Sequence, residues 1–236
     1  WVSYIILKLL NENKSLIASF EMLPKASLGR MLLQNGATNP TDNAIKSFVE
    51  GLDEKLYLYD AEGETSVEKI ISVIFYSAEK LGVKVFVIDS LMKCGINEDD
   101  YNKQKKFINQ LCVASRDLNI KIFLVCHSRK TFNEHGEPSK FDVLGSSNIT
   151  NLADNCITVF RNKAKEEILN AERHDKKEEA ANWYDAQIYI NKQRHGNGFE
   201  GKFGLYFDKE TFRFSTKNYN KNTFKVRNAY KDKDFF

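Results

Sequence analysis

The chain has 236 residues, of which 42% are hydrophobic, so it is long enough to bury a full core and fits one large domain. It contains neither a signal peptide nor an apolar run long enough to span a bilayer, which argues against a membrane protein. Its four cysteines are widely spaced with no CxxC pair, which argues against a disulfide framework. Together these features predict a soluble, intracellular protein with reduced thiols. The formal net charge is +3, and because residues 217–236 hold six Lys or Arg against two Asp, they contribute +4 and leave −1 for the rest.

The basic excess therefore belongs to the C-terminal segment. Such a segment can contact nucleic acid, although a solvated end without fixed structure is the alternative. We predict a folded domain at 1–216 followed by a basic tail at 217–236.

Short apolar runs alternate with amphipathic stretches along the predicted domain, which is typical of alternating strands and helices. In chain order we predict a helix at 1–10, a strand at 15–20, helices at 26–33 and 45–49, a strand at 55–59, a helix at 67–81, a strand at 83–90, a helix at 103–118, strands at 120–126, 156–160 and 186–192, and a hairpin of 203–207 with 211–214. Segments 91–101 and 128–147 are predicted loops, and the charged segment 163–182 is predicted to be a solvated helix or hairpin. The alternation predicts an α/β fold with a mostly parallel central sheet flanked by helices.

The apolar run within 83–90, Val-Lys-Val-Phe-Val-Ile-Asp-Ser, predicts a strand buried on both faces of a parallel sheet, with Asp89 at its carboxyl end. Ligands of open α/β sheets bind at the carboxyl ends of the strands. P-loop NTPases use an apolar strand that ends in Asp to hold Mg²⁺ through its water shell. An acid that caps the following turn is the alternative interpretation of Asp89.

Two other predicted strands also end in polar side chains, Glu21 and His127. Because parallel strands end at the same edge of a sheet, we expect Glu21, Asp89 and His127 to converge there. Their convergence predicts a nucleotide site.

Five motifs occur in one order along the chain. They are Ser-Phe-Glu-Met at 19–22, Val-Ile-Asp-Ser at 87–90, Val-Cys-His-Ser at 125–128, Leu-Gly-Ser-Ser-Asn-Ile-Thr-Asn-Leu-Ala-Asp-Asn at 144–155, and the segment 191–208, which begins Asn-Lys-Gln-Arg-His-Gly-Asn-Gly. This order resembles the C-terminal motor domain of DnaB-like hexameric helicases, and over about 1–214 the chain looks closest to the phage primase-helicases and Twinkle. The resemblance implies a RecA-like P-loop NTPase fold with a C-terminal β-hairpin.

The resemblance also implies roles for the residues at the sheet edge. Glu21 matches the catalytic glutamate that polarises the attacking water, with a helix cap as its alternative role. Asp89 matches the acid that holds Mg²⁺. His127 matches the residue that senses the γ-phosphate of ATP, or of another NTP, and passes the nucleotide state to the adjoining DNA-binding loop.

Four further residues match nucleotide contacts of the family. Lys192 and Arg194 match a pair that reaches the γ-phosphate bound by the neighbouring subunit, with Arg194 as the arginine finger. Arg161 and Phe207 match positions that stack on the nucleotide base.

Two loops of the family face the channel of the ring and contact single-stranded DNA. The matching candidates here are Arg129, Lys130 and Lys140 as cations, with Gly145 and Ser146, within 145–148, as backbone donors. The chain departs from the phage pattern by having Thr150 and Asn151 where an Arg and a Gln stand. This departure removes one phosphate contact and shortens the coupling side chain.

No G-x-x-x-x-G-K-[ST] loop occurs in the chain, although the family holds the phosphates with it. The segment 200–203 is not such a loop, because Phe203 follows the lysine. We expect the loop to lie upstream of residue 1, and we expect the chain as given to be inactive without it.

The resemblance implies the ATP-dependent motor of a replicative helicase that translocates on single-stranded DNA and unwinds duplex, using Mg²⁺. Implied partners are single-stranded DNA, further copies of the chain in a hexameric or heptameric ring, and a primase domain or protein; no membrane partner is expected. The predicted location is the cytoplasm of a bacterium or phage-infected cell, with an organelle as the alternative. Two other functions stay open: a recombinase-like or clock-type RecA-fold ATPase without unwinding, and a non-enzymatic DNA-binding module of the same fold.

Overall fold

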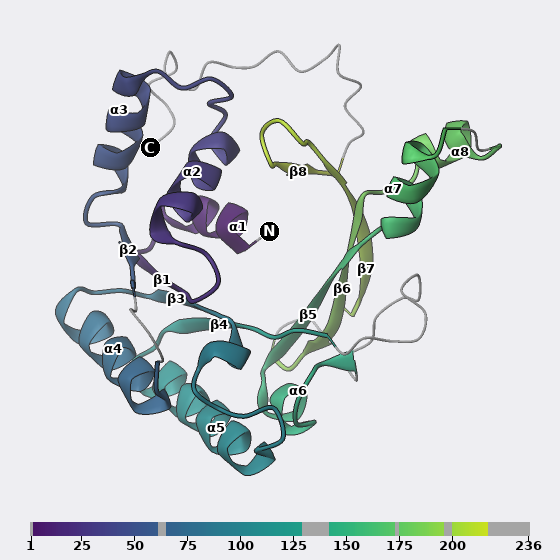
Figure 1. Cartoon of the computed structure of the whole chain (residues 1–236). Helices are drawn as coiled ribbons and strands as arrows, with labels where there is room; N and C mark the ends of the chain where they lie inside the picture. The colour runs from purple at the N-terminus through teal and green to yellow at the C-terminus, as the bar shows by residue number, and fades with distance from the viewer. Residues whose placement is uncertain (1, 61–64, 129–141, 173–174, 196–199, 217–236) are drawn as a thin grey trace.

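The computed structural model of the chain describes residues 2–60, 65–128, 142–172, 175–195 and 200–216 (Figure 1). The predicted basic tail at 217–236 lies outside these residues. Within them, no helix is long and apolar enough to cross a membrane.

The first sheet has four strands in the order β2-β1-β3-β4, and every pair is parallel. Its strands are β1 (Ser15–Ser19), β2 (Leu56–Leu58), β3 (Val85–Asp89) and β4 (Lys121–Val125). Ser19 pairs with Asp89, and Asp89 pairs with Val125, so β1, β3 and β4 end level with one another. The residues that follow these three strands therefore lie together at one edge of the sheet.

Helices cover both faces of this sheet (Figure 1). One face carries α4 (Val67–Lys80), α5 (Tyr101–Asp117) and α6 (Asn148–Leu152), and the other carries α1 (Val2–Leu9), α2 (Pro24–Gln34) and α3 (Asp42–Leu52). Each face of the sheet has its own hydrophobic core, because the buried side chains of β3 point alternately to the two faces. Phe86 and Ile88 pack in the α4–α5 core, whereas Val85 and Val87 pack in the α1–α3 core.

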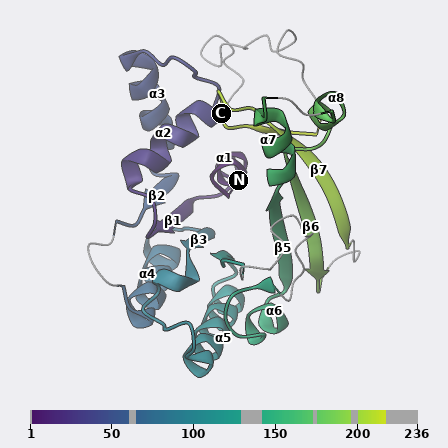
Figure 2. The same ribbon diagram turned by 45° about the vertical axis from the view of Figure 1, so that its right-hand side comes forward.

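The second sheet is antiparallel, in the order β5-β6-β7-β8. Its strands are β5 (Asn155–Arg161), β6 (Ala186–Gln193), β7 (Gly201–Phe207) and β8 (Phe214–Ser215). The charged segment between β5 and β6 forms two short helices, α7 (Lys163–Asn170) and α8 (Lys177–Ala181), which project from this sheet (Figures 1 and 2). The expected α/β fold is confirmed, with the parallel strands gathered in the first sheet.

Contacts between α2 and the C-terminal hairpin join the two sheets. The Gln34 side chain is buried and donates through Nε2 to the Phe212 carbonyl oxygen at 3.2 Å. Arg213 Nε in turn donates to the Gln34 carbonyl oxygen at 2.5 Å. The Arg30 guanidinium lies 5.5 Å from the centre of the Phe212 ring, in cation–π geometry. These contacts fix the second sheet relative to the edge where β1, β3 and β4 end.

We predict that Phe107→Ala lowers the free energy of unfolding by about 3–5 kcal/mol, because Phe107 is fully buried in the core beneath α5. The control is Tyr76→Ala on α4, whose side chain is largely exposed and should cost about 0.5 kcal/mol or less. Urea unfolding followed by circular dichroism measures both. Equal losses in the two variants would show that Phe107 does not anchor this core.

Candidate functional site

The carboxyl edge of the parallel sheet brings three of the predicted residues together. Glu21 follows β1, Asp89 ends β3, and His127 follows β4 by two residues. The Phe20 amide donates to the Asp89 carbonyl oxygen at 2.7 Å, so the pairing of β1 with β3 continues up to Glu21. The predicted convergence is thus present in the structure.

One carboxylate oxygen of Glu21 is the centre of the cluster. Glu21 Oε1 accepts a hydrogen bond from Ser90 Oγ at 2.7 Å and lies 2.9 Å from His127 Nε2. His127 Nε2 also lies 3.2 Å from Ser90 Oγ, which closes a triangle of three side chains. Ser90 is fully buried, whereas Glu21 and His127 are partly open to solvent.

Ser90 was missed by sequence reasoning, which assigned only the preceding residue. The available signal was its place directly after Asp89 at the end of a buried strand, where polar side chains face the edge of the sheet. Only the structure shows that its hydroxyl reaches across to the end of β1.

The pKa values of the two carboxyl groups at this edge, Glu21 and Asp89, are shifted in opposite directions. The hydrogen bond from Ser90, followed by that from His127, holds the pKa of Glu21 below its ordinary value. Burial, followed by the negative charge of Glu21, raises the pKa of Asp89. The hydrogen bond that Asp89 Oδ2 accepts from Ser19 Oγ is long, at 3.4 Å, and offsets this only in part.

The raised pKa of Asp89 fits a site for a divalent cation beside this carboxylate. A partly buried carboxylate next to a second one is stabilised by added positive charge. Within the described residues, no group of three or more His, Cys, Asp or Glu could enclose a metal ion. A single carboxylate suits Mg²⁺, which keeps several of its waters and takes its other ligands from phosphates.

Lys192, on β6, and Arg194, just after this strand, lie together but bind within their own chain. Lys192 Nζ donates to the carbonyl oxygens of Thr150 and Asn151, each at 2.9 Å. Arg194 donates to the Asn151 carbonyl oxygen and to Asp154 Oδ1, also at 2.9 Å. Both cations therefore cap the C-terminus of α6, where unpaired carbonyls and the helix dipole favour positive charge.

The two predicted base-stacking residues, Arg161 and Phe207, lie on different strands of the second sheet and have different neighbours. Arg161 ends β5 and forms a two-point ion pair with Glu166, with both distances 2.6 Å. Phe207 ends β7 and packs against the rings of Phe212 and Phe214. Strand β6 lies between their two strands.

The predicted DNA-binding residues divide into two groups. Arg129, Lys130 and Lys140 lie outside the described residues. Gly145 and Ser146 are described and are buried, and the Ser146 amide donates to Gln104 Oε1 at 2.8 Å. The backbone amide of Ser146 is thus already bonded to α5.

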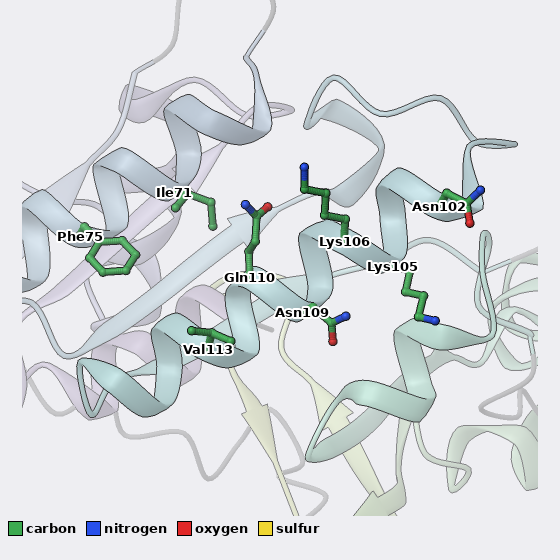
Figure 3. A pocket seen from close by; sticks show the side chains of 8 residues that line it. All are labelled: Ile71, Phe75, Asn102, Lys105, Lys106, Asn109, Gln110 and Val113. Carbon is green, nitrogen blue, oxygen red and sulfur yellow. The ribbon is translucent and has the colours of Figure 1, made fainter.

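A groove of about 500 Å³ lies elsewhere, between α4 and α5 (Figure 3). Its lining comprises Ile71 and Phe75 from α4 with Asn102, Lys105, Lys106, Asn109, Gln110 and Val113 from α5. None of the residues at the carboxyl edge takes part in it. The groove is therefore separate from the Glu21–Asp89–His127 cluster.

The parallel sheet and the acids at its edge define a RecA-like ATPase domain. The chain belongs to the family of the DnaB-like helicase C terminal domain, whose family model matches residues 6–216. The resemblance inferred from the motifs is thereby confirmed. No curated protein matches the chain.

Two similar solved structures agree with this assignment of the fold. One is a DnaB-like replicative helicase described with its interactions with primase, at 17% sequence identity and a TM-score of 0.67 over 86% of this chain. The other is the ATPase domain of G40P, at 18% identity and a TM-score of 0.69, with 90% of this chain and 79% of that chain covered. The chain spans about half the length of the first, 52%.

We predict that Asp89→Asn raises the thermal unfolding midpoint of the ligand-free chain at neutral pH. The pKa of Asp89 is raised, so its charged form costs stability above that pKa, and a neutral side chain of the same shape removes the cost. The gain should fade as the pH falls and Asp89 itself becomes protonated. Asp99→Asn, at an exposed loop position, is the control.

Melting curves with and without Mg²⁺ and nucleotide complete this test. The same substitution should abolish any stabilisation by the ion, since Asp89 is the predicted ligand. A midpoint in Asp89→Asn that equals or falls below that of the unsubstituted chain, with Asp99→Asn unchanged, would contradict the electrostatic account.

Proposed function

We propose that the chain is the motor domain of a replicative DNA helicase that hydrolyses ATP or another NTP, assembles into a ring and translocates on single-stranded DNA. The observation that carries this proposal is the cluster of Glu21, Ser90 and His127 beside Asp89 at the edge of a RecA-like sheet. Membership of the DnaB-like family supports the coupling of this site to DNA. The similar solved structure of a DnaB-like replicative helicase, described with its interactions with primase, supports a primase as a partner.

In the proposed reaction Glu21 orients the attacking water and accepts its proton. A general base has to lie within hydrogen-bonding distance of the proton that it takes, and Glu21 keeps a partly exposed carboxylate for this purpose. Ser90 and His127 fix that carboxylate from one side through Oε1, which leaves Oε2 for the water. When bound, Mg²⁺ would supply positive charge to the phosphates from its place beside Asp89.

His127 connects this site to the next part of the chain. Its Nε2 contacts Glu21, while its carbonyl oxygen accepts a hydrogen bond from the Leu144 amide at 2.8 Å. Ser128 and Val143 pair as an antiparallel bridge directly beyond it. A change at the Glu21 carboxylate can therefore reach residue 144, next to the buried residues Gly145 and Ser146, through two hydrogen bonds. This path supports the proposed role of His127 as a sensor.

We predict that Glu21→Gln lowers kcat about a hundredfold or more while leaving nucleotide and DNA affinity nearly unchanged, because only the transition state loses its base. The assay uses a polypeptide in which these 236 residues are joined to a phosphate-binding loop. Glu79→Gln, an exposed change on α4, is the matched control. Turnover by Glu21→Gln close to that of the control would rule out Glu21 as the base.

We further predict that subunits carrying Arg194→Ala recover ATPase activity when mixed with Glu21→Gln subunits. If Arg194 acts on the neighbour's nucleotide, one interface of a mixed ring contains two intact halves. Arg116→Ala, at the exposed end of α5, should be active on its own. An absence of recovery in confirmed mixed rings would show that Arg194 acts only through its contacts with α6.

A further inference from the structure

Gln104 is a buried polar residue on the apolar face of α5. Its neighbours on that face, Phe107, Ile108 and Leu111, all belong to the core. Only 3% of Gln104 is exposed, yet its amide uses both kinds of hydrogen-bonding group. Nε2 donates to the carbonyl oxygens of Asn97 at 3.2 Å and Glu98 at 3.0 Å, and Oε1 accepts from the Ser146 amide at 2.8 Å.

The turn that Gln104 holds is shaped to fit it. Gly145 has a φ of +112°, in the region that favours glycine. A Cβ at this position would lie 2.7 Å from Gln104 Oε1 and 3.1 Å from Ile149 Cδ1. The chain therefore passes Gln104 at a distance that only glycine allows, and it then presents the Ser146 amide to the same oxygen.

Gln104 also links this turn to the nucleotide site. Asn97 and Glu98 belong to the loop that follows β3, and this loop begins directly after Asp89 and Ser90. Cys94 Sγ in the same loop lies 3.4 Å from the Ser90 carbonyl oxygen, as a donor to it. The loop after Asp89 and the turn before α6 thus share one support, the Gln104 amide.

Beyond the turn, the chain returns to the surface. Ser146 is buried, and its Oγ accepts hydrogen bonds from the backbone and side-chain amides of Asn148 at 3.1 and 2.8 Å. Ser147 is exposed and Asn148 is partly exposed. The buried residues of the turn therefore fix the direction of the exposed ones.

We propose that Gln104 is a positioning residue for DNA binding: it holds the 145–148 turn in the conformation that presents Ser147 and Asn148 to single-stranded DNA. This inference rests on the proposed function, because it takes the turn to face the nucleic acid. Gln104 itself does not touch the DNA. Its role is to keep the backbone of the turn in place before the strand arrives, which lowers the ordering cost of binding.

The test is Gln104→Met, which keeps the length of the side chain and removes every hydrogen bond to the turn. Gln110→Met is the matched control, since Gln110 lies on the same helix and lines the α4–α5 groove instead. Ile108→Val is a second control that lowers core stability without removing a hydrogen bond to the turn, because an aliphatic side chain makes none. Labelled oligo-dT binding is followed by fluorescence anisotropy, and exchange of the Ser146 amide by NMR.

The expected result is loss of Ser146 protection and about tenfold weaker oligo-dT binding in Gln104→Met alone, which corresponds to about 1.4 kcal/mol. Retained protection of Ser146 in Gln104→Met would overturn the anchoring contact. An equal loss of affinity in Ile108→Val at an equal melting temperature would overturn the positioning role. Failure of the unsubstituted chain to bind oligo-dT, with Ser146 exchange still dependent on Gln104, would instead refute the proposed DNA function.

Discussion

The parallel register of β1, β3 and β4 is the constraint on which the rest of the structure depends. Pairing of Ser19 with Asp89 and of Asp89 with Val125 puts the residues after three strands on one level. The register is fixed by burial, since β3 packs against a separate core on each face. A slip by one residue would exchange those faces and would separate Glu21 from Ser90.

The same register places the carboxylates of Glu21 and Asp89 close together, where their negative charges repel each other. Ser90 and His127 donate to Glu21 and keep it ionised, whereas within the described part of the chain the Asp89 carboxylate accepts one long bond, from Ser19. Glu21 therefore contributes to the raised pKa of Asp89. One acid is stabilised by its hydrogen bonds and the other is not, and these unlike surroundings fit the proposed roles of Glu21 as base and Asp89 as metal ligand.

Sequence patterns predicted those features that depend on local order along the chain. Glu21, Asp89 and His127 could be placed because each lies at the end of a short apolar strand or directly beyond it, and parallel strands end at one edge. Ser90 and Gln104 could not be assigned in the same way, because Ser90 bonds Glu21, which is 69 residues away in the chain, and Gln104 bonds the Ser146 amide, which is 42 residues away. Of the antiparallel second sheet only the C-terminal hairpin, present as β7 and β8, was predicted. The separation of β5 and β6 from the parallel sheet was not, since alternating strands and helices do not reveal where one sheet ends and another begins.

The segment from 145 to 152 is held at both ends by side chains from other elements. Gln104 binds its first turn, and Lys192 and Arg194 bind the last carbonyls of α6. In the proposed ring, Arg194 would have to leave the Asn151 carbonyl and Asp154 to reach a neighbour's γ-phosphate. A γ-phosphate carries more negative charge than the Asp154 carboxylate and the Asn151 carbonyl that Arg194 would give up, so the exchange is favourable only when the neighbour holds a triphosphate. Nucleotide bound at one subunit would then loosen α6 of the next, while Gln104 keeps the turn before it in place.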